Sequence, residues 1–202
     1  MLEYETELSQ NGYKHICGID EAGRGPLAGP VCAAAVILPA GLVIDGVNDS
    51  KKISEKKREK LYDEIIGSAL AYSVEFVFQD VIDSINIRQA THLAMENAVK
   101  NLELKPDILI IDGNDNIPFT DCESRYIIKG DANSQTIAAA SILAKVTRDR
   151  YMAELGEKYP EYGFEKHKGY GTKAHMEAIR KHGVLPVHRK TFMTDKVLGI
   201  KS

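Results

Sequence analysis

Apolar residues in this chain form short continuous runs that alternate with longer stripes at helical spacing. The runs at 31–38 and 108–111 end at Pro39 and at an Asp-Gly pair, so they predict buried strands. Spacing of three to four residues predicts helices in between, with Ser54 as an N-cap. The expected elements, in chain order, are strands at 15–20 and 31–38, a helix at 55–70, a strand at 72–78, a helix at 84–102, strands at 108–111 and 125–128, and helices at 135–159 and 173–181.

This order of about five strands mixed with helices predicts an α/β fold in one domain, residues 1–202, with a helical C-terminal part from about residue 160. A chain of 202 residues can bury a sizeable core without a disulfide or a structural metal. The three cysteines, Cys17, Cys32 and Cys122, include no C-x-x-C pair, so we expect reduced thiols and no zinc site.

Membrane and secretion classes are not favoured by the sequence. The longest apolar run, Val31 to Leu38, is far shorter than the roughly 20 residues that a membrane span needs. The first fifteen residues carry Glu3, Glu5 and Glu7 and no apolar stretch, so we expect no secretory signal and a cytoplasmic protein.

The net charge of −3 hides an uneven distribution. Segment sums are −5 for 1–50, +4 for 51–60, −9 for 61–123 and +7 for 124–202, which add to −3. The segment 51–60 alone is also compatible with an ordinary solvated helix face. Together, two basic regions that flank an acidic centre favour a polyanion held over a metal site.

Carboxylates follow three of the predicted strands, each with a glycine nearby. They are Asp20-Glu21, Asp112 and Asp131. Ligands bind at strand ends in α/β sheets, and converging carboxylates would repel one another unless a divalent cation relieved the repulsion. Oxygen-only ligands favour Mg²⁺ or Mn²⁺. Taken singly, Asp112-Gly113 and Gly130-Asp131 are better interpreted as turns; the three sites together favour the metal site.

Two phosphate-binding motifs overlap the first acidic pair. Gly18 to Gly25 has P-loop spacing, but Arg24 and Gly25 replace the Lys and Ser/Thr that a P-loop requires. Gly23-x-Gly25-x-x-Ala28 fits a loose dinucleotide fingerprint, yet a strand rather than a helix is expected to follow it. Neither motif is favoured.

The same residues resemble a known family, ribonuclease HII, and the resemblance covers nearly the whole chain from about residue 13. Small departures from that family's pattern are Thr191, where Ser is usual, and Gly171, where Pro is frequent. The matching motifs, in the family's order, are GIDEAGRGPLAGPV at 18–31, NDSKK at 48–52, IDGN at 111–114, KGD at 129–131, IAAASILAKVTRDR at 137–150, HKGYGT at 167–172 and HRKTF at 188–192.

The resemblance implies a ribonuclease H-like mixed sheet flanked by helices, with a C-terminal helical part that binds substrate. It implies hydrolysis of the RNA strand of RNA–DNA hybrids and incision 5′ to single ribonucleotides in duplex DNA, with 3′-hydroxyl and 5′-phosphate products. The sister family ribonuclease HIII lacks the Gly23-Arg24-Gly25 run, which favours HII. Carried over by position, the catalytic, metal-binding carboxylates are Asp20, Glu21, Asp112 and Asp131.

The proposed mechanism places two Mg²⁺ or Mn²⁺ ions across the scissile phosphate. Asp20 is the expected shared ligand, with Asp112 and Asp131 on separate ions. Glu21 presents a difficulty, because adjacent residues of a regular strand point to opposite faces. Both acids serve one site only if the strand ends or bulges there, or if one of them acts through its carbonyl or a water.

Substrate binding is assigned by the same resemblance to Gly23, Arg24, Gly25 and Tyr170 at the RNA–DNA junction. Glycines let the backbone approach the ribose 2′-hydroxyl, and a tyrosine ring can stack on a following deoxyribose. Without the motif, Tyr170 would be interpreted as a half-buried surface aromatic. Residues expected to bind backbone phosphates are Asn48, Ser50 and Lys51.

Further residues are expected in supporting roles. Lys145, Lys168, Arg189 and Lys190 would add positive charge toward the substrate, and His167 and His188 are expected to be phosphate contacts rather than proton shuttles. Asp149 is interpreted as a salt-bridge partner on a helix surface.

A second function, from another class, is a catalytically silent module that binds RNA–DNA hybrids through the same basic regions. The four carboxylates argue against it, because without metal they would only repel the substrate. We expect a monomer with no membrane partner, and the sequence leaves recruitment by a sliding clamp open.

Overall fold

The computed structural model describes residues 1–114 and 122–200, which form a five-stranded mixed sheet between helices. The strand order is β3-β2-β1-β4-β5. β1 pairs antiparallel with β2 and parallel with β4, and β4 pairs parallel with β5. The strands are β1 (Ile16–Ala22), β2 (Val31–Ile37), β3 (Ala71–Val77), β4 (Ile108–Asp112) and β5 (Glu123–Ile127).

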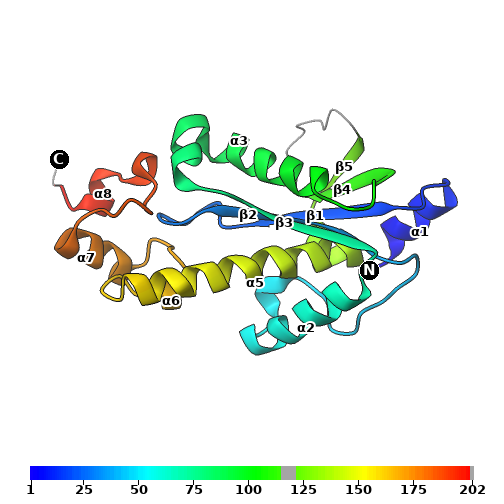
Figure 1. The fold of residues 1–202 in the computed structure, drawn as a ribbon, viewed down its shortest axis with the longest axis horizontal. Coiled ribbons are helices and arrows are strands. Elements are labelled where there is room, and N and C mark those ends of the chain that lie inside the picture. The colour runs from blue at the N-terminus through cyan, green and yellow to red at the C-terminus, as the bar shows by residue number, and fades with distance from the viewer. Residues whose placement is uncertain (115–121, 201–202) are drawn as a thin grey trace.

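Helices cover both faces of this sheet (Figure 1). α3 (Gln79–Lys100) lies on one face, and α5 (Gln135–Lys158) with α2 (Glu55–Ser68) lies on the other. β2 serves both cores because alternate residues point to opposite faces: Ala33 and Ala35 pack with α3, and Ala34 and Val36 pack with α5. The predicted mixed sheet flanked by helices is confirmed.

Gly18 shows how closely α5 approaches the middle of the sheet. A Cβ at this position would lie 2.4 Å from the carbonyl carbon of Thr136 and 2.5 Å from the nitrogen of Ile137, so the helix backbone rests directly on β1. This contact brings the start of α5 beside the middle of β1. It therefore brings Asp131, just before α5, toward Asp20, which is two residues beyond Gly18.

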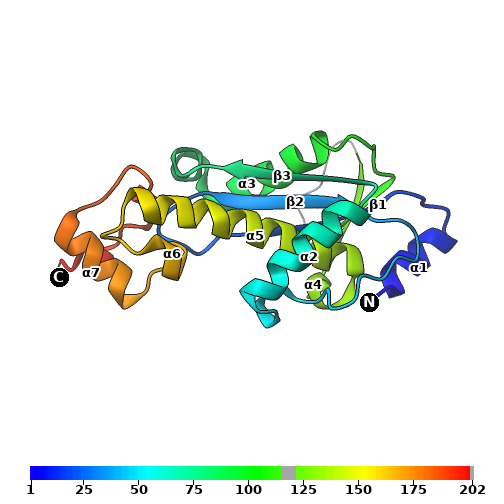
Figure 2. The same cartoon turned by 60° about the horizontal axis from the view of Figure 1, so that its bottom comes forward.

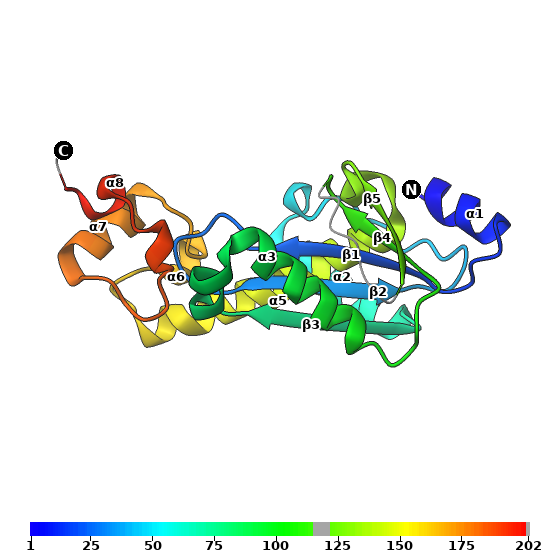
Figure 3. The ribbon, with the colours of Figure 1, turned by 90° about the horizontal axis from the view of Figure 1, so that it is seen from above.

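The C-terminal part forms its own apolar cluster at the end of the sheet opposite α1 (Figures 2 and 3). Phe164, Met152 and Ile179 lie within this cluster. Its elements are α6 (Phe164–His167), α7 (Lys173–His182), a short 3₁₀ turn η2 (Lys190–Phe192) and α8 (Asp195–Leu198).

Every expected element is present, and most bounds agree within a few residues. α3 begins at Gln79 rather than Ser84, because two helical segments join across a kink at Asn86, whose φ is 68°. The Asn86 side chain accepts from the N–H groups of Arg88 and Gln89 and so caps the second segment. Ser54 is the N-cap residue of α2, as predicted, although its side chain makes no capping hydrogen bond.

Elements not expected from the sequence are short. They are α1 (Glu3–Gln10), η1 (Ser50–Lys52), α4 (Gly130–Asn133), α6, η2 and α8. α1 is held by Glu5, whose buried carboxylate accepts from the Ser134 hydroxyl at 2.6 Å and from the Thr136 N–H at 3.0 Å. Such a bond at the first turn of α5 depends on tertiary contact, which periodicity does not reveal.

Among the described residues, none of the helices has both the length and the apolar character that crossing a lipid bilayer demands.

Candidate active site

Three carboxylates converge at the end of the sheet where β1 and β4 run side by side. One carboxylate oxygen from each of Asp20, Asp112 and Asp131 lies within 4.8 Å of the others. Asp20 and Asp112 come from adjacent parallel strands, whose carboxyl ends share an edge. Asp131 comes from α4, which is fixed by a bond of 2.7 Å from the Gly130 N–H to Asp112 Oδ1. The three aspartates therefore form one cluster. A role in turns alone does not explain why the carboxylates of Asp112 and Asp131 lie beside that of Asp20.

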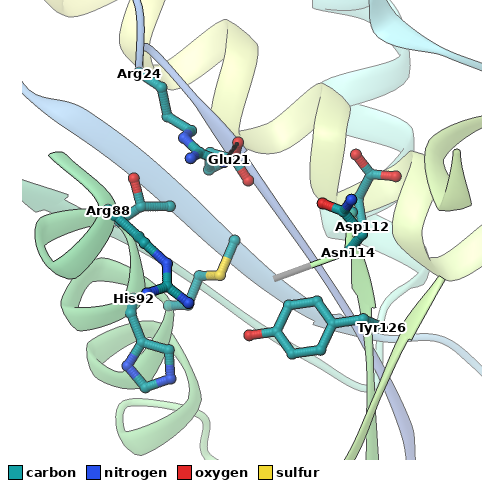
Figure 4. A pocket seen from close by; sticks show the side chains of 10 residues that line it. Glu21, Arg24, Arg88, His92, Asp112, Asn114 and Tyr126 are labelled. Carbon is teal, nitrogen blue, oxygen red and sulfur yellow. Dashed lines mark ion pairs between the residues drawn. The ribbon is translucent and has the colours of Figure 1, made fainter. Parts of the chain in front are cut away.

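Glu21 points to the other face of the sheet. β1 stays in register with β2 through this region, Asp20 opposite Ala34 and Glu21 opposite Ala33, so no bulge brings the two side chains together. Figure 4 shows the Glu21 side chain in a cavity of about 280 Å³ on the α3 face, near Arg24 and across from Arg88. Arg24 Nη1 lies 3.6 Å from Glu21 Oε1.

That cavity touches the carboxylate cluster at Asp112, which lines it together with Glu21 (Figure 4). Its other polar walls are Arg88, His92 and Asn114, with Tyr126 from β5. Glu21 can therefore reach a ligand at the strand ends from the opposite side of the sheet. The described cluster consists of Asp20, Asp112 and Asp131, and Glu21 lies beside it, lining both this cavity and a second one that Asp20 also lines.

The electrostatics of the cluster favour a cation. Burial and the nearby charges of Glu21 and Asp112 raise the pKa of Asp20 well above that of an ordinary aspartate, although a Ser141 hydrogen bond opposes the shift. The donor set consists of carboxylate oxygens, which are the ligands that Mg²⁺ and Mn²⁺ prefer. The residues present therefore fit a divalent ion.

A second cavity, of about 360 Å³, lies on the α5 face of β1. Asp20, the Gly23-Arg24-Gly25 loop and Tyr170 line it. Tyr170 keeps 45% of its surface exposed, and a Cβ on Gly25 would lie 3.6 Å from its ring. The loop and the tyrosine, which are remote in sequence, thus face one another beside the first aspartate of the cluster.

The three residues expected to bind phosphates are placed differently from one another. Ser50 lines the second cavity but is only 3% exposed, and its hydroxyl lies 2.9 Å from that of Ser141. Asn48 is exposed, and its side chain accepts from the Asp49 N–H at 2.8 Å. The side chain of Lys51 lies outside the described part of the structure.

Arg189 was expected to face the substrate, and the structure contradicts this. Its side chain is fully buried and donates to the carbonyl oxygens of Gly23, Arg24 and Gly29. Asp149 also departs from expectation: it does form ion pairs, with Lys145 at 2.7 Å and Arg58 at 3.9 Å, but it is buried rather than on the surface.

His188 is a structural residue of the C-terminal part rather than the phosphate contact expected from the sequence. It is buried, and its Nε2 lies 3.1 Å from Nε2 of His175. His167 stacks on His175 with ring centroids 4.4 Å apart, and His167 Nε2 lies 2.7 Å from the Tyr162 carbonyl oxygen. Burial lowers the pKa of both His175 and His188 to about 4.

Sequence comparison identifies close relatives of this chain. The family model described as Ribonuclease HII matches residues 17–195. Ribonuclease HII of Caldicellulosiruptor bescii is 57% identical over 192 residues, which cover 95% of this chain and 93% of that protein. A Ribonuclease HII of Bacillus cereus is 60% identical over 95% of this chain and 74% of its own length.

Solved structures share the fold. The ribonuclease H2 from Pyrococcus horikoshii OT3 aligns with a TM-score of 0.77 and 29% identity, over 91% of this chain and 97% of that one. The RNase HII of a PCNA complex from Archaeoglobus fulgidus gives 0.75 and 28%, over 89% and 96%. A Bst-RNase HIII in complex with Mn²⁺ gives 0.68 at 19% identity, over 95% and 71%, and supports the fold alone.

Proposed function

Because the chain belongs to the ribonuclease HII family, and so is a ribonuclease H acting on RNA–DNA, we propose that it also incises duplex DNA 5′ to single embedded ribonucleotides. The products would carry a 3′-hydroxyl and a 5′-phosphate. One observation carries the proposal: the carboxylates of Asp20, Asp112 and Asp131 converge beside the cavity that holds Gly23–Gly25 and Tyr170. Phosphodiester chemistry and ribonucleotide recognition would thus share one edge of the sheet.

The carboxylates Asp20, Asp112 and Asp131, with Glu21 from the opposite face, are the catalytic groups of this proposal. Two Mg²⁺ or Mn²⁺ ions bound by them would supply an activated water and stabilise the leaving 3′-oxygen. Asp20 is the central ligand because burial keeps its carboxylate poorly solvated and ready to accept a cation. The Gly130 N–H orients Asp112.

Recognition of the ribonucleotide is assigned to the second cavity. The backbone of Gly23, Arg24 and Gly25 would bind the 2′-hydroxyl, the group that distinguishes RNA from DNA. The exposed ring of Tyr170 would stack on the next sugar when that sugar is deoxyribose. Asn48, Ser50 and Lys51 remain the proposed phosphate contacts. One chain supplies every residue of this site, so we propose that it acts as a monomer.

The test uses labelled duplex DNA that contains one ribonucleotide, incubated with Mg²⁺, with Mn²⁺ and with chelator. An all-DNA duplex and a plain RNA–DNA hybrid serve as controls. We expect a metal-dependent nick on the 5′ side of the ribonucleotide and no cutting of all-DNA. Cutting of the hybrid alone would discard the recognition role of Gly23–Gly25 and Tyr170. No cutting by folded protein would overturn the nuclease proposal and favour a hybrid-binding module.

A further inference from the structure

Two buried arginines lie beneath the loop at residues 23–30. Arg189 is fully buried, and its three nitrogens donate to Gly29 O at 3.0 Å, Arg24 O at 2.8 Å and Gly23 O at 2.6 Å. Each guanidinium nitrogen thus holds one carbonyl of the loop. A lysine could not satisfy three separate carbonyls in this planar arrangement.

Arg148 holds the other half of the same loop. It is 1% exposed and donates to Pro30 O at 2.9 Å, Ala28 O at 3.2 Å and Lys168 O at 3.0 Å. Lys168 lies two residues before Tyr170, so this guanidinium joins the loop to the segment that carries the tyrosine ring. The position of Arg148 also explains why residue 23 is a glycine, because a Cβ there would lie 2.0 Å from Arg148 Nε.

The binding of these carbonyls determines where the loop's N–H groups point. The structure contains no cis peptide among its described residues, and in a trans peptide the C=O and N–H lie on opposite sides. Because Arg189 binds the carbonyls of Gly23 and Arg24, the N–H groups of Arg24 and Gly25 are directed away from it. Over the described residues, no backbone carbonyl accepts from either N–H.

Burying a guanidinium carries a large desolvation penalty, which apolar packing would avoid. Burial lowers the pKa of Arg189 to about 9, with a further contribution from the neighbouring charge of Arg148, and the group still carries its proton at neutral pH. The segment that carries this cation is anchored to the body by Asp83 of α3, which accepts from the N–H groups of Lys190 and Thr191 at 2.8 and 2.9 Å. The buried cation is thus held firmly against the loop.

We propose that Arg189 is a positioning residue for ribonucleotide recognition: it holds two consecutive loop carbonyls so that the N–H groups of Arg24 and Gly25 face the substrate. Arg148 sets the place of Tyr170 relative to those N–H groups. This inference rests on the proposed function, because it concerns how the chain recognises the 2′-hydroxyl. Under this proposal, Arg148 and Arg189 affect the selectivity for a ribonucleotide although both side chains are buried and neither contacts the substrate.

The test compares Arg189→Lys and Arg189→Met with Arg180→Lys. Arg180 is a matched control, since its guanidinium also donates to backbone carbonyls, but to those of Val197 and Lys196 rather than to those of the loop. Binding is measured in an Asp112→Asn background to prevent cutting, with duplexes that do or do not contain one ribonucleotide. We expect both Arg189 variants to lose the preference for the ribonucleotide about tenfold, with all-DNA affinity unchanged. Arg180→Lys should keep the preference.

These measurements distinguish failure of the proposed function from failure of the positioning role of Arg189. If the background protein shows no preference for the ribonucleotide and the unmodified protein does not cut beside it, the proposed function fails. If the preference exists and survives in the folded Arg189→Lys variant, the positioning role of Arg189 is overturned.

A second measurement uses only the Asp112→Asn protein, so it tests the proposal even if the Arg189 variants do not fold. The amide signals of Arg24 and Gly25 are followed by nuclear magnetic resonance while each duplex is added. We expect both signals to shift with the ribonucleotide-containing duplex and to remain in place with all-DNA. Equal responses to the two duplexes would overturn the proposal without any change at Arg189.

Discussion

The carboxylate cluster and the arginine-held loop are neighbouring polar regions that differ in how their charges are compensated. The cluster brings like charges together, whereas the charged groups under the loop have hydrogen-bond partners within the chain. In the cluster, Asp20, Asp112 and Asp131 bring like charges within 4.8 Å, and burial together with that repulsion raises the pKa of Asp20. Under the loop, Arg148 and Arg189 place every guanidinium nitrogen on a carbonyl oxygen. The first region therefore fits an external cation, whereas the guanidinium groups of the second are bound within the chain.

This difference separates residues that act on a ligand from residues that shape the protein. Neutralising one member of a repelling cluster should leave stability intact or improve it while removing ligand binding. Disturbing a satisfied buried cation should lower stability first, because it leaves carbonyls or a charge without partners. Stability and activity measured together can therefore assign a residue to one region or the other.

The largest expected effect is that of Asp112→Asn on turnover. The amide oxygen can still accept from the Gly130 N–H, but the site loses one of the negative charges that we propose hold metal. We expect kcat to fall by at least about a thousandfold, since metal chemistry contributes several kcal/mol to such reactions. Tm without metal should stay the same or rise. Initial rates on the ribonucleotide-containing duplex, together with thermal melts, check both expectations.

Asp45→Asn provides the control for that substitution, because Asp45 is an exposed aspartate outside the cluster. It should change neither the rate nor the increase in Tm that Mg²⁺ produces. A variant Asp112→Asn that retained both would show that Asp112 does not hold metal.

The sequence predicted the members of the carboxylate cluster better than it predicted the loop's support. Strand ends could be found because apolar runs stop at an acid, and the parallel pairing of β1 with β4 then brings Asp20 and Asp112 together. Strand alternation also predicts that Glu21 points away from Asp20. Only the register with β2 shows that no bulge turns the two side chains to the same face. The local sequence pattern is enough to predict a site residue when the direction of its side chain is determined by its own strand.

Arg189 and Arg148 could not be found in this way. A buried arginine has the same letter as an exposed one in the sequence. Of the six carbonyl groups that these two arginines bind, three each, five lie 118 to 166 residues away and one lies 20 residues away. Gly23 was interpreted as space for substrate, whereas its positive φ and the guanidinium of Arg148 already require glycine. Tertiary contacts of this kind leave no periodic signal.

The next largest effect is expected for Gly23→Ala, which disturbs the second region. Gly23 has a φ of 94°, and the added Cβ would lie 2.0 Å from Arg148 Nε, so the arginine must leave its carbonyls. We expect a loss of about 2 to 4 kcal/mol in the free energy of unfolding from strain and displaced packing together. Urea denaturation measures the change.

Gly12→Ala separates the two contributions. Its φ is 96°, almost that of Gly23, but nothing lies within 4 Å of its Cβ position. It should therefore show the conformational cost alone, about 1 kcal/mol. Equal losses at Gly12 and Gly23 would mean that Arg148 yields easily and that the loop is not rigidly held.

A smaller effect, confined to recognition, is expected for Tyr170→Ala. The ring is exposed over the second cavity and supports no core cluster, so stability should change little. We expect kcat/KM to fall about tenfold on a duplex with one embedded ribonucleotide, through loss of stacking, and less on a long hybrid. Tyr170→Phe keeps the ring and should stay near the wild-type value. A fall of the same size on both substrates would remove Tyr170 from the selection of the junction.

The smallest effect is the pH dependence that His175 and His188 give to the C-terminal part. The Leu185 N–H donates to His188 Nδ1 at 2.8 Å, so His188 Nε2 carries the proton and donates to His175 Nε2. Nδ1 of His175 in turn donates to the Tyr170 carbonyl at 2.9 Å. Both rings are thus neutral, with His167 stacked against His175 as the nearest titratable neighbour.

Their folded pKa of about 4 lies below the ordinary histidine value, so the unfolded chain takes up protons first as pH falls. Their contribution to stability is full above about pH 6.5 and is lost as pH falls toward 4. We expect Tm to drop by several degrees between about pH 7.5 and about pH 5, and to drop less in His188→Gln. His182→Gln, which changes an exposed histidine, should retain the wild-type slope. An unchanged slope in His188→Gln would show that this pair does not govern the acid sensitivity of the fold, because the variant lacks one of its two titrating rings.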